Sequence, residues 1–255
     1  AACHTAARYF LLNNRGAIAP GYLGDFVIID NFNDFNIEMV FKRGELMYDG
    51  QLRDFPTPEI DPYLVKRAHD TFHLTKLTAE DFKDGRPHAI IGLVPGEIIS
   101  EDAGYIDHID VEYDILKVAV IERHKNTHHI GLGYIKGYGL KSGAVATSIS
   151  HDSHNIIVVG TNEEEMAAAA NRIVENHGGI TVMENGNVLG EVTLAIAGIM
   201  SDDPLVMVNS ALESAKDEAF RLGVSRDIDP FMTLSFMALP VIPTLRITTR
   251  GVFDV

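Results

Sequence analysis

The sequence predicts an α+β fold, in which a layered, mixed α/β domain of about 200 residues follows a short β-rich segment. Apolar residues make up 46% of the 255 residues, which is enough for a sizeable core. Helix-like and strand-like segments alternate without a strict βαβ order, so a regular parallel sheet is not expected. The two prolines in Phe55–Pro58 end secondary structure and stiffen the chain. We therefore predict domains at residues 1–55 and 56–255.

The first domain is predicted to begin with a helix and to continue as strands. The Ala-rich start reads as a helix that is already under way at Ala1 and is stopped by Asn13–Gly16. Because the chain opens inside this helix and has no initiator Met, we expect its natural N-terminus to be missing. Strands are expected at Phe26–Ile29, Ile37–Lys42 and Glu45–Tyr48.

The second domain alternates between strands and capped helices. Asp61-Pro62 predicts a helix start, because Asp caps free N–H groups and proline fits the first turn. Thr161–Glu164 reads as a capping box, and Asp203-Pro204 as the start of a further amphipathic helix. The apolar tail Pro230–Pro243 is expected to pack across the core. Strands are expected at His88–Leu93, Glu97–Ser100, Leu116–Glu122, Ala144–Ile149, Asn155–Val159, Ile180–Met183 and Val188–Leu194, the last two joined at Asn185-Gly186.

Charge and cysteine content exclude several classes of function. The chain has 36 acidic and 21 basic residues and a net charge of −15, which disfavours binding to nucleic acid. No apolar run approaches the roughly 20 residues of a membrane span, so no membrane partner is expected. A single cysteine, Cys3, excludes an internal disulfide and a cysteine-rich zinc site. A cytoplasmic protein is therefore expected.

His151-Asp152-Ser153-His154-Asn155 is the densest group of reactive side chains. It is expected in a turn between two buried strands, where scaffolds present functional groups. Its imidazoles, carboxylate and hydroxyl could bind a metal, transfer protons or hold a polar heterocycle. The alternative is a self-contained polar turn, in which Asp152 and Ser153 bind nearby backbone amides. No third metal ligand lies at a recognisable spacing, so no metal site is assigned.

Glu122-Arg123-His124 is the second candidate group, at the end of a predicted strand. These three residues are assigned to the same candidate pocket, and the alternative is a surface ion pair between Glu122 and Arg123. The glycine-rich stretch Gly131–Gly143 matches neither a P-loop nor a dinucleotide-binding loop, so we interpret it as close backbone packing. A nucleophilic role for Ser153 is disfavoured, because the G-x-S-x-G context is absent.

Two parts of the chain resemble a known family. GAIAPGYLGDFVIID, at residues 16–30, resembles the exit from an amidohydrolase barrel, where the chain returns to complete a small β-sandwich. Gly24 departs from that motif, in which Ala is usual. The rest of the chain resembles the C-terminal domain of bacterial and archaeal adenine deaminases, although His128 stands where a small residue is expected. The motifs that carry this resemblance are IERHK (121–125), GYGLKSGA (137–144), HDSHN (151–155) and PFMTLSFMALPVIP (230–243).

The resemblance implies hydrolysis of adenine to hypoxanthine and ammonia, as in purine salvage and adenine catabolism. It also implies a divalent metal pair, manganese or iron, whose hydroxide would attack C6 of the base. The family's metal ligands lie on barrel strands expected upstream of Ala1, so no metal ligand is assigned here. The chain alone is expected to be inactive. Adenine, the missing N-terminal barrel and further copies of the protein in a homo-oligomer are its expected partners.

Two other interpretations stay open. A different amidohydrolase, acting on a cyclic amide, would share the barrel exit but should lack the long C-terminal domain. A catalytically silent assembly module would use the apolar tail for dimerisation. In that case, mutation of the His151 turn would leave turnover unchanged.

Overall fold

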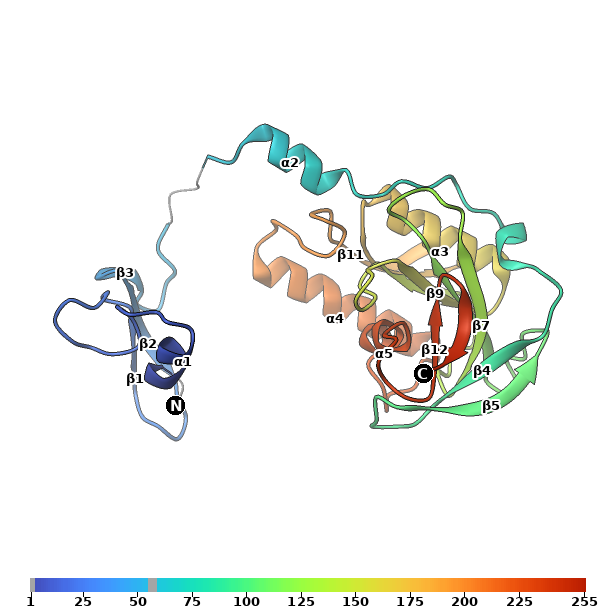
Figure 1. Ribbon diagram of the computed structural model, residues 1–255, viewed down its shortest axis with the longest axis horizontal. Coiled ribbons are helices and arrows are strands. Elements are labelled where there is room, and N and C mark those ends of the chain that lie inside the picture. The colour runs from blue at the N-terminus through green and yellow to red at the C-terminus, as the bar shows by residue number, and fades with distance from the viewer. Residues whose placement is uncertain (1–2, 55–58) are drawn as a thin grey trace. The chain divides into compact units, whose positions relative to one another are not determined.

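The computed structural model describes residues 3–54 and 59–255 and separates into two compact units, Ala1–Ile60 and Asp61–Val255 (Figure 1). The predicted linker, Phe55–Pro58, lies outside the described residues. A large mixed sheet combined with helices confirms the predicted α+β class. No helix in the described part of the chain is long and apolar enough to cross a membrane.

Unit 1 consists of one short helix and a three-stranded antiparallel sheet in the order β1-β2-β3. Among its described residues, Ala7 is the one buried apolar side chain. Apolar side chains of the sheet, such as Val27 and Ile37, stay almost half exposed at 49% and 48%. A sheet of this size needs an apolar face packed against something else. The elements are α1 (His4–Tyr9), β1 (Phe26–Ile29), β2 (Ile37–Lys42) and β3 (Glu45–Tyr48), with the strands where they are predicted.

Unit 2 is built on an eight-stranded sheet in the order β11-β10-β8-β9-β6-β7-β4-β5, in which only β4 and β7 run parallel. Every residue of the inner strands β8 and β9 is buried, because helices cover both faces. The strands are β4 (His88–Leu93), β5 (Ser100–Ile106), β6 (Ile115–Ile121), β7 (Ile130–Lys136), β8 (Ala144–Thr147), β9 (Ile156–Gly160), β10 (Gly179–Glu184) and β11 (Asn187–Thr193).

Two apolar cores lie on opposite faces of this sheet. Val118, Val145 and Ile157 belong to the core beneath α4 and α5, whereas their neighbours Ala119 and Ala146 belong to the core beneath α3. Alternate residues of a strand point to opposite faces, so a strand buried on both sides reads as a continuous apolar run. The helices of unit 2 are α2 (Pro62–His69), η1 (Ala79–Phe82), α3 (Glu163–Glu175), α4 (Leu205–Arg221) and α5 (Pro230–Met237).

Several predicted elements differ from the structure in position or type. The predicted cap at Thr161 is displaced by one residue, since Asn162 caps α3 by accepting from the Glu165 N–H at 2.8 Å. The strand expected at Glu97–Ser100 lies instead at Ser100–Ile106, at the edge of the sheet, where every residue but Ser100 is at least partly exposed and no apolar run marks the strand. The first half of the tail is the helix α5, which is apolar on all sides and therefore has no helical periodicity.

The glycine-rich stretch packs closely, as predicted. Gly131 lies in β7, where an added Cβ would come within 1.9 Å of the Thr248 carbonyl oxygen. The hairpin formed by β12 (Leu245–Thr248) and β13 (Gly251–Asp254) covers β7 at this point, and neither strand is marked in the sequence. Glycine is required here because backbone meets backbone.

Candidate functional site

The His151–Asn155 turn joins β8 to β9, as predicted, and lies against α5. The His151 N–H donates to the Ser235 carbonyl of α5 at 3.3 Å, and the His154 N–H to the Ser150 carbonyl at 2.6 Å. The His151 ring lies 5.5 Å from the Phe236 ring and 5.9 Å from the His154 ring, measured between centroids. The main chain of the turn is thus fixed, and the two imidazole rings lie edge-on to each other.

Several polar side-chain atoms in and around this turn have no hydrogen-bond partner. The side-chain amide of Asn155 donates to the Ser153 hydroxyl at 3.1 Å. Among the described residues, no backbone N–H group donates to the side chain of Asp152 or Ser153. Seven buried side-chain N or O atoms lack a partner in the described part of the chain, and four of them lie here. The four are Ser150 Oγ, His154 Nδ1, Asn155 Oδ1 and Ser235 Oγ. Such atoms are costly when they are left dry, so a ligand or water is expected to satisfy them.

Arg123 holds the turn from the other side. Its side chain is 1% exposed and stacks on Phe72, with 4.2 Å between the guanidinium carbon and the ring centroid. It donates to the carbonyls of His154 at 2.5 Å, Thr71 at 2.9 Å and Ala197 at 2.9 Å. One side chain therefore joins three segments that are far apart in the sequence.

Glu122 does not pair with Arg123, so the predicted alternative of an ion pair is wrong. Its carboxylate accepts from the backbone N–H groups of His124, Lys125 and Thr127 and from the Thr127 hydroxyl at 2.9 Å. Glu122 thus folds the loop that follows β6. This role is structural, because every one of its partners belongs to that loop.

His124 brings the two predicted groups together. Its Nε2 atom lies 2.8 Å from the Ser153 carbonyl oxygen in the His151–Asn155 turn. The same side chain lines a polar pocket of about 410 Å³ with residues from the end of α2 and the chain after it. Sequence analysis missed these residues, whose main signal is the basic last turn of α2. They are Arg67, Asp70, Thr71 and His73.

Burial shifts two pKa values in this region. Desolvation, followed by the charge of His151, lowers the pKa of His154 below its ordinary value of 6.5. Desolvation also lowers the pKa of Arg123 to about 10, which still leaves the guanidinium charged at neutral pH. His154 is therefore a neutral imidazole next to a fixed positive charge, able to accept or donate one hydrogen bond.

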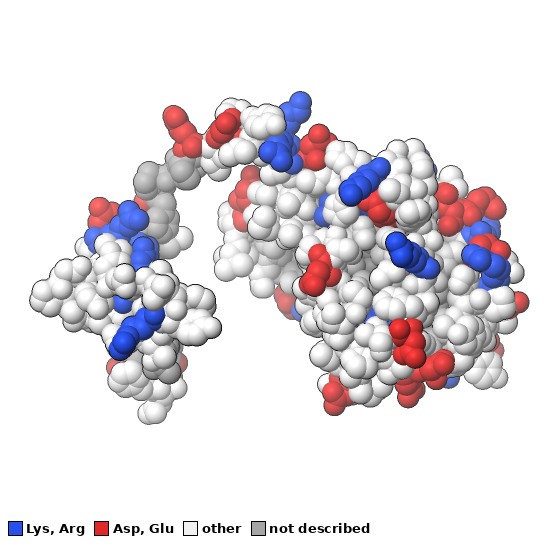
Figure 2. All heavy atoms as spheres, in the orientation of Figure 1, with Lys and Arg blue, Asp and Glu red and all other residues white. Residues whose placement is uncertain are grey.

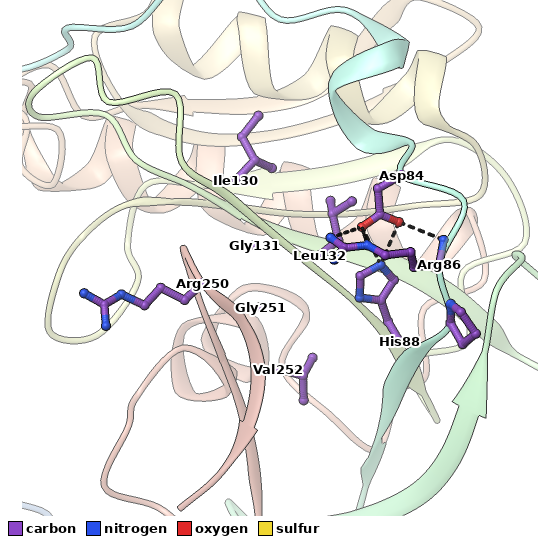
Figure 3. A pocket seen from close by; sticks show the side chains of 10 residues that line it. Asp84, Arg86, His88, Ile130, Gly131, Leu132, Arg250, Gly251 and Val252 are labelled. Atoms are coloured by element: carbon purple, nitrogen blue, oxygen red, sulfur yellow. Dashed lines mark hydrogen bonds and ion pairs between the residues drawn. The ribbon is translucent and has the colours of Figure 1, made fainter.

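A second polar pocket, of about 240 Å³, lies between the starts of β4 and β7 and the strand β13 (Figure 3). Asp84 accepts from Arg86 and His88, and these three side chains point toward one another, whereas Arg250 points away. Burial alone would raise the pKa of Asp84, but the bonds from His88 and Arg86 lower it to about 2. These charges satisfy each other, so this pocket is not the candidate site.

No cluster of three or more His, Cys, Asp or Glu residues suited to a metal occurs within residues 3–54 and 59–255. His151 and His154 are a pair with no third ligand. The residues present therefore do not fit the metal pair that the family resemblance implies.

Comparison with known proteins identifies the class. Residues 97–255 match the model of the adenine deaminase C-terminal domain, and the chain belongs to this family. It is 40% identical to an adenine deaminase of Dehalococcoides mccartyi, over 98% of this chain and 45% of the relative. It is 42% identical to adenine deaminase 1 of Rhizobium johnstonii, over 100% of this chain and 45% of the relative. The chain thus spans slightly less than half the length of these curated relatives.

Arg123→Lys should destabilise unit 2 by about 2–4 kcal/mol, because an ammonium cannot reach three carbonyls that a planar guanidinium spans. Urea unfolding of residues 1–255 measures this loss. Arg221→Lys, at an exposed ion pair with Glu218, is the matched control and should leave the midpoint unchanged. Equal midpoints for the two variants would contradict the role given to Arg123.

His154 should make stability depend on pH. Its pKa is lower in the folded protein than in the unfolded chain, so its contribution is complete above pH 6.5 and is lost as pH falls through the folded value. His154→Gln should therefore flatten the fall in the free energy of unfolding as the pH is lowered below 6.5. His177→Asn controls for the loss of an imidazole elsewhere. An unchanged slope for His154→Gln would refute the shift.

Proposed function

We propose that this chain is the C-terminal part of an adenine deaminase, which hydrolyses adenine to hypoxanthine and ammonia. The observation that carries the proposal is the similarity of the whole chain to slightly less than half of proteins named adenine deaminase. A divalent metal pair, manganese or iron, would be held by the part of the enzyme outside residues 1–255. A role in purine salvage and adenine catabolism, a cytoplasmic location and a homo-oligomeric state belong to the same proposal.

Unit 1 supports the attachment to a larger enzyme. Its three-stranded sheet leaves an apolar concavity of about 440 Å³, lined by side chains that include Val40, Met47 and Leu52. Residues 1–55 would be the last barrel helix and a segment of a composite β-sandwich, completed by the rest of the enzyme. Residues 56–255 would be the C-terminal domain.

The His151–Asn155 turn would contribute to the substrate pocket of the complete enzyme. Adenine carries ring nitrogens that accept hydrogen bonds and an amino group that donates them. The neutral His154 imidazole and the Asn155 amide offer both kinds of partner, and His154 Nδ1 and Asn155 Oδ1 have no partner among the described residues. Arg123 and His124 would position this turn, whereas Asp152 and Ser153 would line its exposed rim.

The first test compares the full-length enzyme with residues 1–255. Supplied with manganese or ferrous iron, the full-length enzyme should deaminate adenine with ordinary turnover, roughly 1–1000 per second, and lose activity when the metal is chelated. Residues 1–255 should show none, because their described part contains no metal site. Adenine loss followed by absorbance measures both. Ordinary turnover by residues 1–255, or an inactive full-length protein, would overturn the proposal.

The second test concerns the two imidazoles. In the full-length enzyme, His151→Ala and His154→Ala should each lower kcat/KM about 100-fold or more, the usual cost of losing one hydrogen bond to a reacting group. Stability should fall by no more than about 1 kcal/mol. His108→Ala, at an exposed histidine, is the control. If the variants melt many degrees lower while the folded fraction keeps wild-type kinetics, the histidines are structural.

A further inference from the structure

The start of α4 exposes three consecutive apolar side chains. Leu205, Val206 and Met207 are 81%, 79% and 60% exposed, whereas Ala215 further along the same helix is fully buried. Ala215 packs on Gly190 of β11, where an added Cβ would meet its Cα at 2.7 Å. At 1.5 Å per residue, the helix starts about 15 Å before that contact. Val208 of the next turn already packs on the core, so the exposed apolar side chains belong to the first turn of α4.

A second apolar segment lies on α2. This eight-residue helix has no buried residue, yet it carries Tyr63, Leu64 and Val65, which are between 42% and 64% exposed. A helix this short gains most of its stability from packing of an apolar face. In Figure 1, α2 and the start of α4 extend from the same side of unit 2.

The segment between β11 and α4 connects both helices to the candidate site. The Ala197 N–H donates to the Ala68 carbonyl of α2 at 2.6 Å, and the Ala197 carbonyl accepts from Arg123 at 2.9 Å. Arg123 in turn holds the His154 carbonyl. A body that packs on both helices would thus lie next to the His151–Asn155 turn.

We propose that Tyr63–Val65 and Leu205–Met207 form a docking surface for the metal-binding part of the same full-length polypeptide. This inference rests on the proposed function. The chain covers 45% of its relatives, so the larger part of such a polypeptide is available to cover this surface. Exposed apolar patches of this kind mark interfaces. Figure 2 shows few charged side chains where the first turn of α4 projects, although the chain carries a net charge of −15.

A second copy of the chain is the competing occupant, and the site argues against it. A second copy would cover the His151–Asn155 turn with another unit whose described residues contain no metal site. The metal-binding part would instead bring the reacting centre next to the His151–Asn155 turn. The same contact would cover the apolar surface and place the turn beside the reacting centre.

Site-specific photo-cross-linking tests the docking surface in the full-length, metal-loaded enzyme. A benzophenone side chain replaces Leu205 in one variant and Leu64 in another. If one variant does not fold, the other still tests the surface. Tyr105 on β5, which is 72% exposed at the far edge of the sheet, is the control position. Cross-links are mapped by mass spectrometry in a mixture of light and heavy isotope-labelled protein, which separates bonds within one chain from bonds between copies.

We expect both variants to cross-link within one chain, to residues outside 1–255, and the control to give no such product. Cross-links between light and heavy copies, cross-links confined to residues 1–255, or none at all would overturn the docking surface. Adenine hydrolysis by the unsubstituted enzyme is measured in parallel. An active enzyme with the wrong cross-links refutes only the docking surface, whereas an inactive one refutes the proposed function.

Discussion

The arrangement around the candidate site depends on one buried charge, the guanidinium of Arg123. A buried cation is costly unless it is fully hydrogen-bonded, and Arg123 finds no carboxylate partner among the described residues. Its cost is offset by carbonyl oxygens from three segments and by the Phe72 ring. Because the guanidinium is planar and its donors point in fixed directions, these segments have one mutual arrangement. The His151–Asn155 turn, the end of α2 and the chain before α4 are therefore positioned together.

A second buried arginine in unit 2 also donates to backbone carbonyl groups from separate segments. Arg246 is fully buried and donates to the carbonyls of Ile98 at 2.7 Å and Pro243 at 2.9 Å, and to the Ser100 hydroxyl at 2.6 Å. It joins β5 at the sheet edge to the start of β12. The four unpartnered atoms near the His151–Asn155 turn belong to Ser150, His154, Asn155 and Ser235, whereas at Arg246 it is the arginine's own Nε atom that lacks a partner among the described residues. Both arginines order the backbone, but only Arg123 orders a turn with free polar atoms.

Elements that have a local sequence signal are predicted, whereas elements that depend on contacts between residues far apart in the sequence are missed. The strands of unit 1 and the turn at His151–Asn155 carry apolar runs or turn residues, and they lie where predicted. The helix α5 and the hairpin of β12 and β13 leave no periodic signal. The meeting of the Glu122–His124 group with the turn follows from the pairing of Ile121 with Ile156 across β6 and β9. No local pattern encodes that register. The carbonyls of Thr71 and Ala197 carry no side-chain signal at all.

Unit 2 contains two kinds of group without a partner: the polar atoms near the His151–Asn155 turn and the exposed apolar side chains of α2 and α4. The hydrogen bonds of Arg123 connect the two regions. A polar atom left dry costs about 1–3 kcal/mol, and an exposed Leu or Met forgoes a similar stabilisation. Four such atoms together would cost about 4–12 kcal/mol, which is comparable with the total stability of a typical domain. A partner that covers the apolar surface would recover its burial, and a ligand or water bound at the turn would supply the missing hydrogen bonds. If the proposed docking surface is correct, one partner would provide both contributions, and the candidate site would lie at the edge of that interface.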